Sequence, residues 1–178
     1  TSVTGILTLA DCSGALSGEA KDQDNASPGT LIFWTYPSKV FYSRITTNFD
    51  VLTNWGVNAD GTGANPVAGD LTSGIATFVV RNTHTVTVNT DIDVLKLEVG
   101  QGVSGLLNFE NNATVRNLAI RGGIEVKTGA SILFDRNQTV SHTLTLYGNI
   151  INNGTFDIYY DGNSVINTTV SENIVISG

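Results

Sequence analysis

The sequence has few charged residues, a single cysteine and no methionine. Lys, Arg, Asp and Glu together make up 14% of the 178 residues, whereas about 25% is usual in soluble domains. Sixteen acidic residues outnumber nine basic ones, so the formal net charge is −7. Because nucleic-acid binding needs a basic surface, this balance argues against a nucleic-acid partner.

Cysteine and long apolar segments are also too scarce for several classes of protein. The lone Cys12 excludes a disulfide within the chain and a cysteine-based metal site, and we expect a small buried or half-buried side chain there. No apolar run approaches the roughly 20 residues that span a bilayer. No run of Lys and Arg suits an anionic membrane surface either. The sequence therefore predicts no membrane insertion.

The polar residues that are present favour strands and tight turns. The chain contains 23 Thr, 18 Asn and 19 Gly. Thr is β-branched and favours strands, while Gly and Asn tolerate positive φ at corners. The same turn geometry explains why five Asn-x-Ser/Thr sequons occur without invoking glycosylation. The composition predicts an all-β chain.

One short pattern recurs three times, at residues 104–109, 129–134 and 153–158, with spacings of 25 and 24 residues. In each copy, a turn of small or polar residues leads into a strand with alternating apolar positions. The matching apolar residues are Leu107, Ile132 and Phe156, followed by Phe109, Phe134 and Ile158. A repeat of this length that is built from strands indicates a solenoid.

Two further sets of apolar residues suggest two more strands in each repeat. The second set pairs Leu95 with Leu97, Leu118 with Ile120, and Leu144 with Leu146. The third set consists of Val115, Val140 and Val165. Three short strands in about 25 residues make one coil of a parallel, right-handed β-helix. A β-sandwich is the alternative, because strands spaced by about 8 to 12 residues fit that fold as well.

The chain divides into two predicted parts. Residues 1–70 contain strands, an aromatic-rich cap at 31–36 and 49–55, and a long loop at 58–69 with typical turn residues. Residues 71–178 contain the β-helix coils with their period of about 25 residues. We expect further domains of a longer parent chain beyond Thr1 and Gly178.

Several short motifs occur in a characteristic order. They are Phe41-Tyr-Ser-Arg44, Asn54-Trp55, Pro66-Val-Ala-Gly-Asp70, His84-Thr-Val-Thr-Val88 and Asn153-Gly-Thr-Phe156. This order resembles the β-helical segments of large secreted and cell-surface, adhesin-like proteins of the Bacteroidetes type. The resemblance implies a secreted or cell-surface protein on the exterior of the outer membrane, often exported by type IX secretion. It implies no catalytic residues.

Candidate chemical groups are few. His84 and His142 have no acid two or four residues further on, so we expect surface strand or turn positions for both. Residues Thr83, Thr85 and Thr87 alternate along one strand, as in ice-binding solenoids, but neighbouring coils do not repeat them. We therefore assign no function to these positions.

The acidic residues supply the alternatives to a purely structural role. Asp91 with Asp93, Asp135 with Arg136, and Asp157 with Asp161 are the candidate groups. Paired acids can hydrolyse glycosides or bind Ca²⁺ for polysaccharide elimination. These acids do not share a coil position, so we predict no catalytic residue, no metal site and no cofactor, with a loose Ca²⁺ site as the alternative.

Aromatic residues supply a second alternative. Tyr159 and Tyr160 are adjacent, so one of them faces outward if the strand alternates, and Trp34 with Tyr36 is a similar pair. Our candidate binding residues are Tyr159, Asp157 and Asp161.

The sequence thus predicts a structural and adhesive β-helix segment of an exported bacterial protein, without catalysis. A polysaccharide lyase, a glycoside hydrolase or a carbohydrate-binding module is the alternative. The predicted partner is a polysaccharide or another cell-surface or secreted protein.

Overall fold

The computed structural model describes residues 39–109, 114–134 and 142–157, together with the backbone of four further strands, β1 (Ser17–Ala20), β2 (Ile32–Thr35), β17 (Val165–Thr168) and β18 (Ile176–Ser177). The chain forms two compact units, Thr1–Pro37 and Ser38–Gly178. In the first unit, β1 and β2 pair antiparallel.

The second unit consists of short strands, so the predicted all-β class is confirmed. Its other strands are β3 (Lys39–Ser43), β4 (Thr47–Asn48), β5 (Trp55–Gly56), β6 (Ala76–Val80), β7 (Thr85–Val88), β8 (Ile92–Val94), β9 (Lys96–Val99), β10 (Leu106–Phe109), β11 (Asn117–Ile120), β12 (Ile124–Val126), β13 (Ser131–Leu133), β14 (Thr143–Leu146), β15 (Ile150–Asn152) and β16 (Thr155–Asp157). Two single-turn 3-10 helices, η2 (Leu52–Asn54) and η3 (Ala68–Leu71), occur among its described residues.

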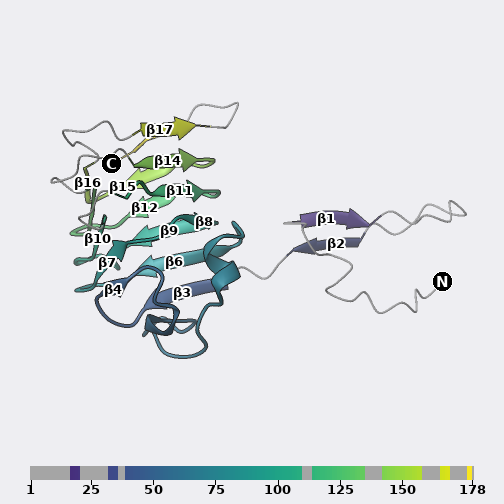
Figure 1. Ribbon diagram of the computed structural model, residues 1–178, viewed down its shortest axis with the longest axis horizontal. Helices are drawn as coiled ribbons and strands as arrows, with labels where there is room; N and C mark the ends of the chain where they lie inside the picture. Colours follow the sequence, from purple (N-terminus) through teal and green to yellow (C-terminus); the bar gives the residue numbers. More distant parts are fainter. Residues whose placement is uncertain are drawn as a thin grey trace, which may run out of the picture. The chain divides into compact units, whose positions relative to one another are not determined.

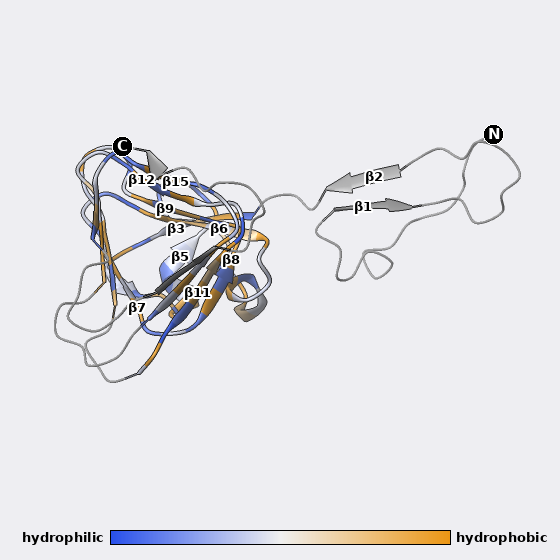
Figure 2. Cartoon of the chain, turned by 90° about the horizontal axis from the view of Figure 1, so that it is seen from above, coloured by the Kyte–Doolittle hydropathy of each residue, from blue (hydrophilic) through white to orange (hydrophobic). Residues whose placement is uncertain are grey.

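These strands form three sheets (Figure 1). The strand orders are β16-β13-β10-β7-β4, β17-β14-β11-β8 and β18-β15-β12-β9-β6-β3-β5. Every pairing among the described strands of this unit is parallel except that of β5 with β3. From β6 onward, each strand pairs with the strand three places further along the chain. Viewed from above, the three sheets lie as three sides around a common interior (Figure 2).

The repeat predicted from the sequence is confirmed in the five-stranded sheet. Leu107 is the partner of Ile132, which in turn is the partner of Phe156. Leu107 and Ile132 are buried, and Phe156 packs against the same core cluster. Buried and half-buried residues alternate along β7, β10 and β13 because successive side chains point to opposite faces.

The second predicted set of apolar residues is partly wrong. Leu118 pairs with Leu144 as expected, but the strand on the other side of it contributes Ile92 rather than Leu95. Leu97 lies in the seven-stranded sheet, where its partner is Ile124. Leu95 alone forms the corner between β8 and β9, so the alternation changes phase there and the predicted register fails.

The third predicted strand position is wrong at Val115, which is 47% exposed and precedes β11. The third strands are instead β12 and β15, which begin at the buried residues Ile124 and Ile150. Val165 begins β17 and pairs with Thr143, whereas Val140 lies outside the described residues.

Aromatic side chains fill the N-terminal end of the second unit. Phe49, Trp55 and Phe78 are fully buried, with ring centroids 4.9 to 5.1 Å apart. The indole of Trp55 donates a hydrogen bond of 3.1 Å to the carbonyl of Phe49. Strands β3 and β4, which lie within the 1–70 segment, pair in parallel with β6 and β7. They therefore belong to the same sheets as the following strands.

Glycines let the segment before β12, at Gly122 and Gly123, approach the segment before β15, at Gly148, closely. A Cβ atom on Gly148 would lie 2.6 Å from the carbonyl carbon of Gly122 and 2.8 Å from the nitrogen of Gly123. These atoms belong to the backbone, so they have little freedom to move aside. The corner therefore requires glycine at position 148.

We predict that Gly148→Ala lowers the free energy of unfolding by about 1–3 kcal/mol, because the added methyl group overpacks the corner. The matched control is Gly69→Ala, since a Cβ atom there would have no neighbour within 4 Å. That variant should stay within about 1 kcal/mol of the parent chain. Urea denaturation of both variants measures the difference, and equal midpoints would show that the corner is not tightly packed.

Candidate functional site

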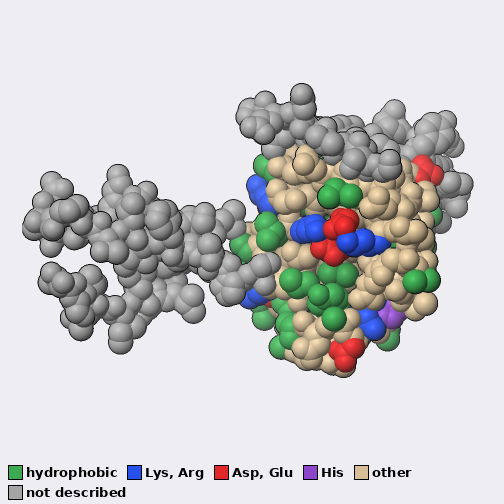
Figure 3. All heavy atoms as spheres, turned by 180° about the vertical axis from the view of Figure 1, so that it is seen from behind, with side chains coloured by type: hydrophobic (Ala, Val, Ile, Leu, Met, Phe, Trp, Pro, Cys, Tyr) green, Lys and Arg blue, Asp and Glu red, His purple; other side chains and the backbone are tan. Residues whose placement is uncertain are grey.

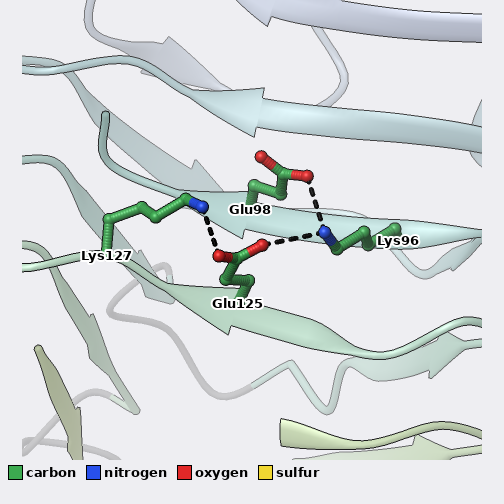
Figure 4. Close-up of polar contacts among 4 residues, drawn as sticks. All are labelled: Lys96, Glu98, Glu125 and Lys127. Carbon is green, nitrogen blue, oxygen red and sulfur yellow. Dashed lines mark hydrogen bonds and ion pairs between the residues drawn. The ribbon is translucent and has the colours of Figure 1, made fainter. Parts of the chain in front are cut away.

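Charged side chains gather on the outer face of the seven-stranded sheet (Figure 3). Lys96 and Glu98 lie on β9, Glu125 lies on β12, and Lys127 follows β12 (Figure 4). The Lys96 Nζ atom lies 2.7 Å from Glu98 Oε1 and 2.9 Å from Glu125 Oε2. Lys127 binds the other oxygen of Glu125. We call these four residues the charge row.

The pairing register explains the charge row. Glu98 and Glu125 are direct partners on neighbouring strands, and like charges in this position repel each other. Lys96 binds both carboxylates and so offsets this repulsion. All four side chains retain some exposure to water, which screens the attraction and limits its contribution to stability.

The contacts within the charge row favour the charged forms of Glu125 and Lys96. Hydrogen bonds from Lys127 and Lys96 lower the pKa of Glu125 below its ordinary value, although burial acts in the opposite direction. Burial alone would lower the pKa of Lys96, but hydrogen bonds to Glu125 and Glu98 outweigh it and raise that pKa. A general acid or base works best with a pKa near the operating pH. Both shifts move away from neutrality, so these two groups are poorly suited to proton transfer.

The neighbouring corner, between the four-stranded and seven-stranded sheets, contains a second set of paired groups. The Arg121 guanidinium binds both carboxylate oxygens of Asp93, with 2.7 Å between Nε and Oδ1. Its Cζ atom also lies 4.2 Å from the centre of the Tyr147 ring. Arg121 and Tyr147 each follow directly after a strand, β11 and β14, and these strands pair in register. The guanidinium is therefore held in one orientation.

A furrow of about 600 Å³ runs along this corner. We call it the corner furrow, and its lining residues are Lys96, Arg121, Gly122, Gly123, Ile124, Tyr147, Gly148, Asn149 and Ile151. The lining comes from three successive strands of the seven-stranded sheet and from the corners before two of them. The furrow contains fixed cationic donors, a tyrosine ring and bare glycine backbone.

Asp91 and Asp93 bind different partners. Asp91 accepts hydrogen bonds from the backbone and the side-chain amide of Asn117, at 2.9 and 3.1 Å. Asp93 binds Arg121 instead. Within the ranges that the structure describes, no group of three His, Cys, Asp or Glu residues is placed to hold a metal ion.

The remaining candidate residues lie apart from these aspartates. Asp157 ends β16 in the five-stranded sheet, whereas Asp91 and Asp93 belong to the four-stranded sheet and its approach. The other candidate residues, Asp135, Arg136, Tyr159, Tyr160 and Asp161, lie outside the described residues, as do Cys12, Tyr36 and the side chain of Trp34.

One polar residue of the Pro66–Asp70 motif has a structural role. Asp70 is buried, accepts a hydrogen bond of 2.9 Å from the backbone of Val67, and pairs with Lys39 at 2.7 Å. It therefore joins the η3 turn to strand β3 and does not act as an exposed acid.

A serine–histidine pair that the sequence analysis missed joins the end of β3 to the residue before β7. Ser43 Oγ lies 2.8 Å from His84 Nδ1 and accepts the backbone N–H of Arg81 at 2.9 Å. The geometry resembles that of a nucleophile with its base. However, Ser43 is 0% exposed, so no substrate can reach its hydroxyl. Ser43 belongs to the motif at 41–44 and His84 to the motif at 84–88. The presence of both motifs was the only feature of the sequence that could have suggested this contact.

The surface position predicted for His142 is wrong. This residue is only 2% exposed, and its ring stacks on Phe109 with 4.5 Å between the ring centres. Its Nδ1 atom accepts the backbone N–H of Arg116 at 3.1 Å. The imidazole is therefore buried because it packs as a flat aromatic ring while its polar atom remains hydrogen-bonded.

We predict that His84 makes the chain less stable in mild acid. Burial, assisted by the positive charge of Arg81, lowers the pKa of His84 below its ordinary value of 6.5. The folded chain then binds fewer protons at this site than the unfolded chain, so acid favours unfolding. The stabilising contribution is complete above pH 6.5 and is lost as the pH falls through the folded-state pKa.

Chemical denaturation on either side of pH 6.5 measures this loss of stability. The variant His84→Gln cannot be protonated, so its stability should fall less between the two pH values than that of the parent chain. His142 is present in both proteins, which isolates the effect of His84. An identical fall in the two proteins would contradict the prediction.

Comparison with known proteins identifies no relative. No protein-family model matches the chain, and neither does any curated protein or solved structure. None of the helices in the described ranges is long and apolar enough to cross a membrane. The function is therefore argued from the geometry above.

Proposed function

We propose that the second unit is a parallel, right-handed β-helix that serves as a stiff, non-catalytic structural and adhesive segment of an exported bacterial surface or secreted protein. The pairing of each strand with the strand three places further along is the observation that carries this proposal. The resemblance of its ordered motifs to adhesin-like proteins of the Bacteroidetes type supports the cellular setting.

Stiffness follows from this pairing. In a solenoid, each coil stacks on the next at about 4.8 Å through a continuous set of backbone hydrogen bonds. The buried ladders Leu107–Ile132 and Leu118–Leu144 add apolar contacts along the same direction. Bending the stack would break contacts in all three sheets, so the segment can hold an attached ligand or domain at a fixed distance.

We predict that deleting residues 107–131, a segment of one full period, leaves a folded chain. The deletion joins Leu106 to Ile132, which then takes the place of its pairing partner Leu107 next to Val86. The shortened chain should unfold cooperatively and keep its far-ultraviolet circular dichroism spectrum.

The control deletion, residues 107–118, removes about half a period and brings mismatched strands together. It should abolish cooperative unfolding. If both deletions unfold the chain, or if both leave it folded, the solenoid arrangement is wrong and the β-sandwich becomes the better interpretation.

A polysaccharide lyase or a glycoside hydrolase is the catalytic alternative, with Asp157 or Asp91 as the acid. We expect no turnover on a panel of acidic and neutral polysaccharides, with or without Ca²⁺, measured by release of reducing ends and unsaturated products. Turnover that disappears in Asp157→Ala or Asp91→Ala would overturn the non-catalytic proposal.

A carbohydrate-binding module without turnover is the third possibility. Tyr159, Asp157 and Asp161 are its candidate residues, and a polysaccharide or another surface protein is the corresponding partner. The described residue Asp157 is half-buried on β16.

A further inference from the structure

The corner furrow has the features of a site for a chain of sugar units. Its lining residues come from three successive strands of one sheet and from the corners before two of them, so a ligand that spans several sugar units could contact more than one strand. Three glycines, Gly122, Gly123 and Gly148, belong to its lining. Gly122 is exposed, so a ligand can approach the backbone there.

The polar groups of the furrow are already fixed before any ligand arrives. Asp93 accepts two of the five N–H groups of the Arg121 guanidinium, and Glu98 and Glu125 accept two of the three N–H groups of Lys96. Each cation keeps further N–H groups. Because their orientation is set by the carboxylates, little side-chain entropy is lost when a hydroxyl group binds.

Apolar surface lies beside these donors. The Tyr147 ring lines the furrow, and Arg121 lies over one of its faces. Ile151 is 43% exposed on the same stretch of wall. A hexose ring presents C–H groups on its faces and hydroxyl groups around its rim. The C–H faces suit the apolar Tyr147 and Ile151, and the hydroxyl groups suit the N–H donors of Lys96 and Arg121.

The local charge selects against an acidic ligand. Lys96, Lys127 and Arg121 are balanced by Asp93, Glu98 and Glu125, and the whole chain carries a net charge of −7. A carboxylate or sulfate on the ligand would be repelled by Asp93, Glu98 and Glu125, which already bind Lys96 and Arg121. A neutral hydroxyl group accepts a hydrogen bond from the same cations without displacing their partners.

We infer that the corner furrow binds a neutral hexose or pentose polysaccharide, with Tyr147 and Ile151 contacting the sugar faces and Arg121, Lys96 and Asn149 contacting the hydroxyl groups. The inference rests on the proposed adhesive function and specifies its ligand class. It concerns residues other than Asp157, Tyr159 and Asp161, so the two sets of candidate residues can be tested separately.

The test measures binding of cello-, xylo- and malto-oligosaccharides to the full chain by calorimetry, with oligogalacturonate of the same length as the acidic probe. Tyr147→Ala should weaken binding at least about tenfold, a change of about 1.4 kcal/mol. Tyr42→Ala is the matched control, because Tyr42 lies on β3 beside Val79, outside the furrow lining. It should bind as the parent chain does.

Two further measurements separate the furrow from an effect on folding. Asn149→Ala removes an exposed lining side chain and should also weaken binding at a urea concentration well below the unfolding midpoint of the variant. Binding of a neutral sugar should change little between salt concentrations of about 0.05 and 0.5 M.

Three results would overturn the inference. They are the absence of binding to all neutral oligosaccharides, equal losses in Tyr147→Ala and Tyr42→Ala, and salt-sensitive binding of oligogalacturonate alone. None of these results would bear on the coil deletions or on polysaccharide turnover, so the inference can fail while the scaffold proposal stands. Conversely, turnover of a polysaccharide would reject the non-catalytic scaffold whichever residues bind the sugar.

Discussion

In-register parallel pairing is the constraint on which the rest of this unit depends. A strand can meet its parallel partner only after the chain has passed through two other sheets, so each pass must use nearly the same number of residues. A slip of one residue would turn the apolar side chains of a strand toward water. Leu107 pairs with Ile132, which is 25 residues further along the chain, and Ile132 pairs with Phe156, a further 24 residues along. The register is therefore kept from one strand of the sheet to the next.

The same pairing determines what the outer surface looks like. Residues that occupy equivalent positions in successive passes become neighbours at about 4.8 Å. This places Glu98 beside Glu125, where Lys96 is needed between them, and it places Arg121 against Tyr147. The polar groups of the candidate site are therefore arranged along the direction of stacking rather than around a single loop.

Sequence analysis succeeded where alternation was unbroken and failed where a corner interrupted it. The matched residues of β10, β13 and β16 could be predicted because each follows a turn and alternates cleanly. Leu95 was misplaced because a corner of one residue reverses the alternation without any Gly or Pro to mark it. His142 was misplaced because residue type alone indicates polarity, whereas stacking on Phe109 explains its burial. The Ser43–His84 pair and the furrow depend on contacts between separate passes, which no local pattern reveals.

The corner furrow arises from the demands of stacking. Gly148 must approach Gly122 and Gly123 closely, so side chains are excluded from the corner where the two passes meet. The lining of the furrow therefore combines glycine backbone with side chains, among them Tyr147 and Lys96. A β-carbon at position 148 would meet the backbone of Gly122 and Gly123, so the close approach of these segments explains why glycine occurs among the residues that line the furrow.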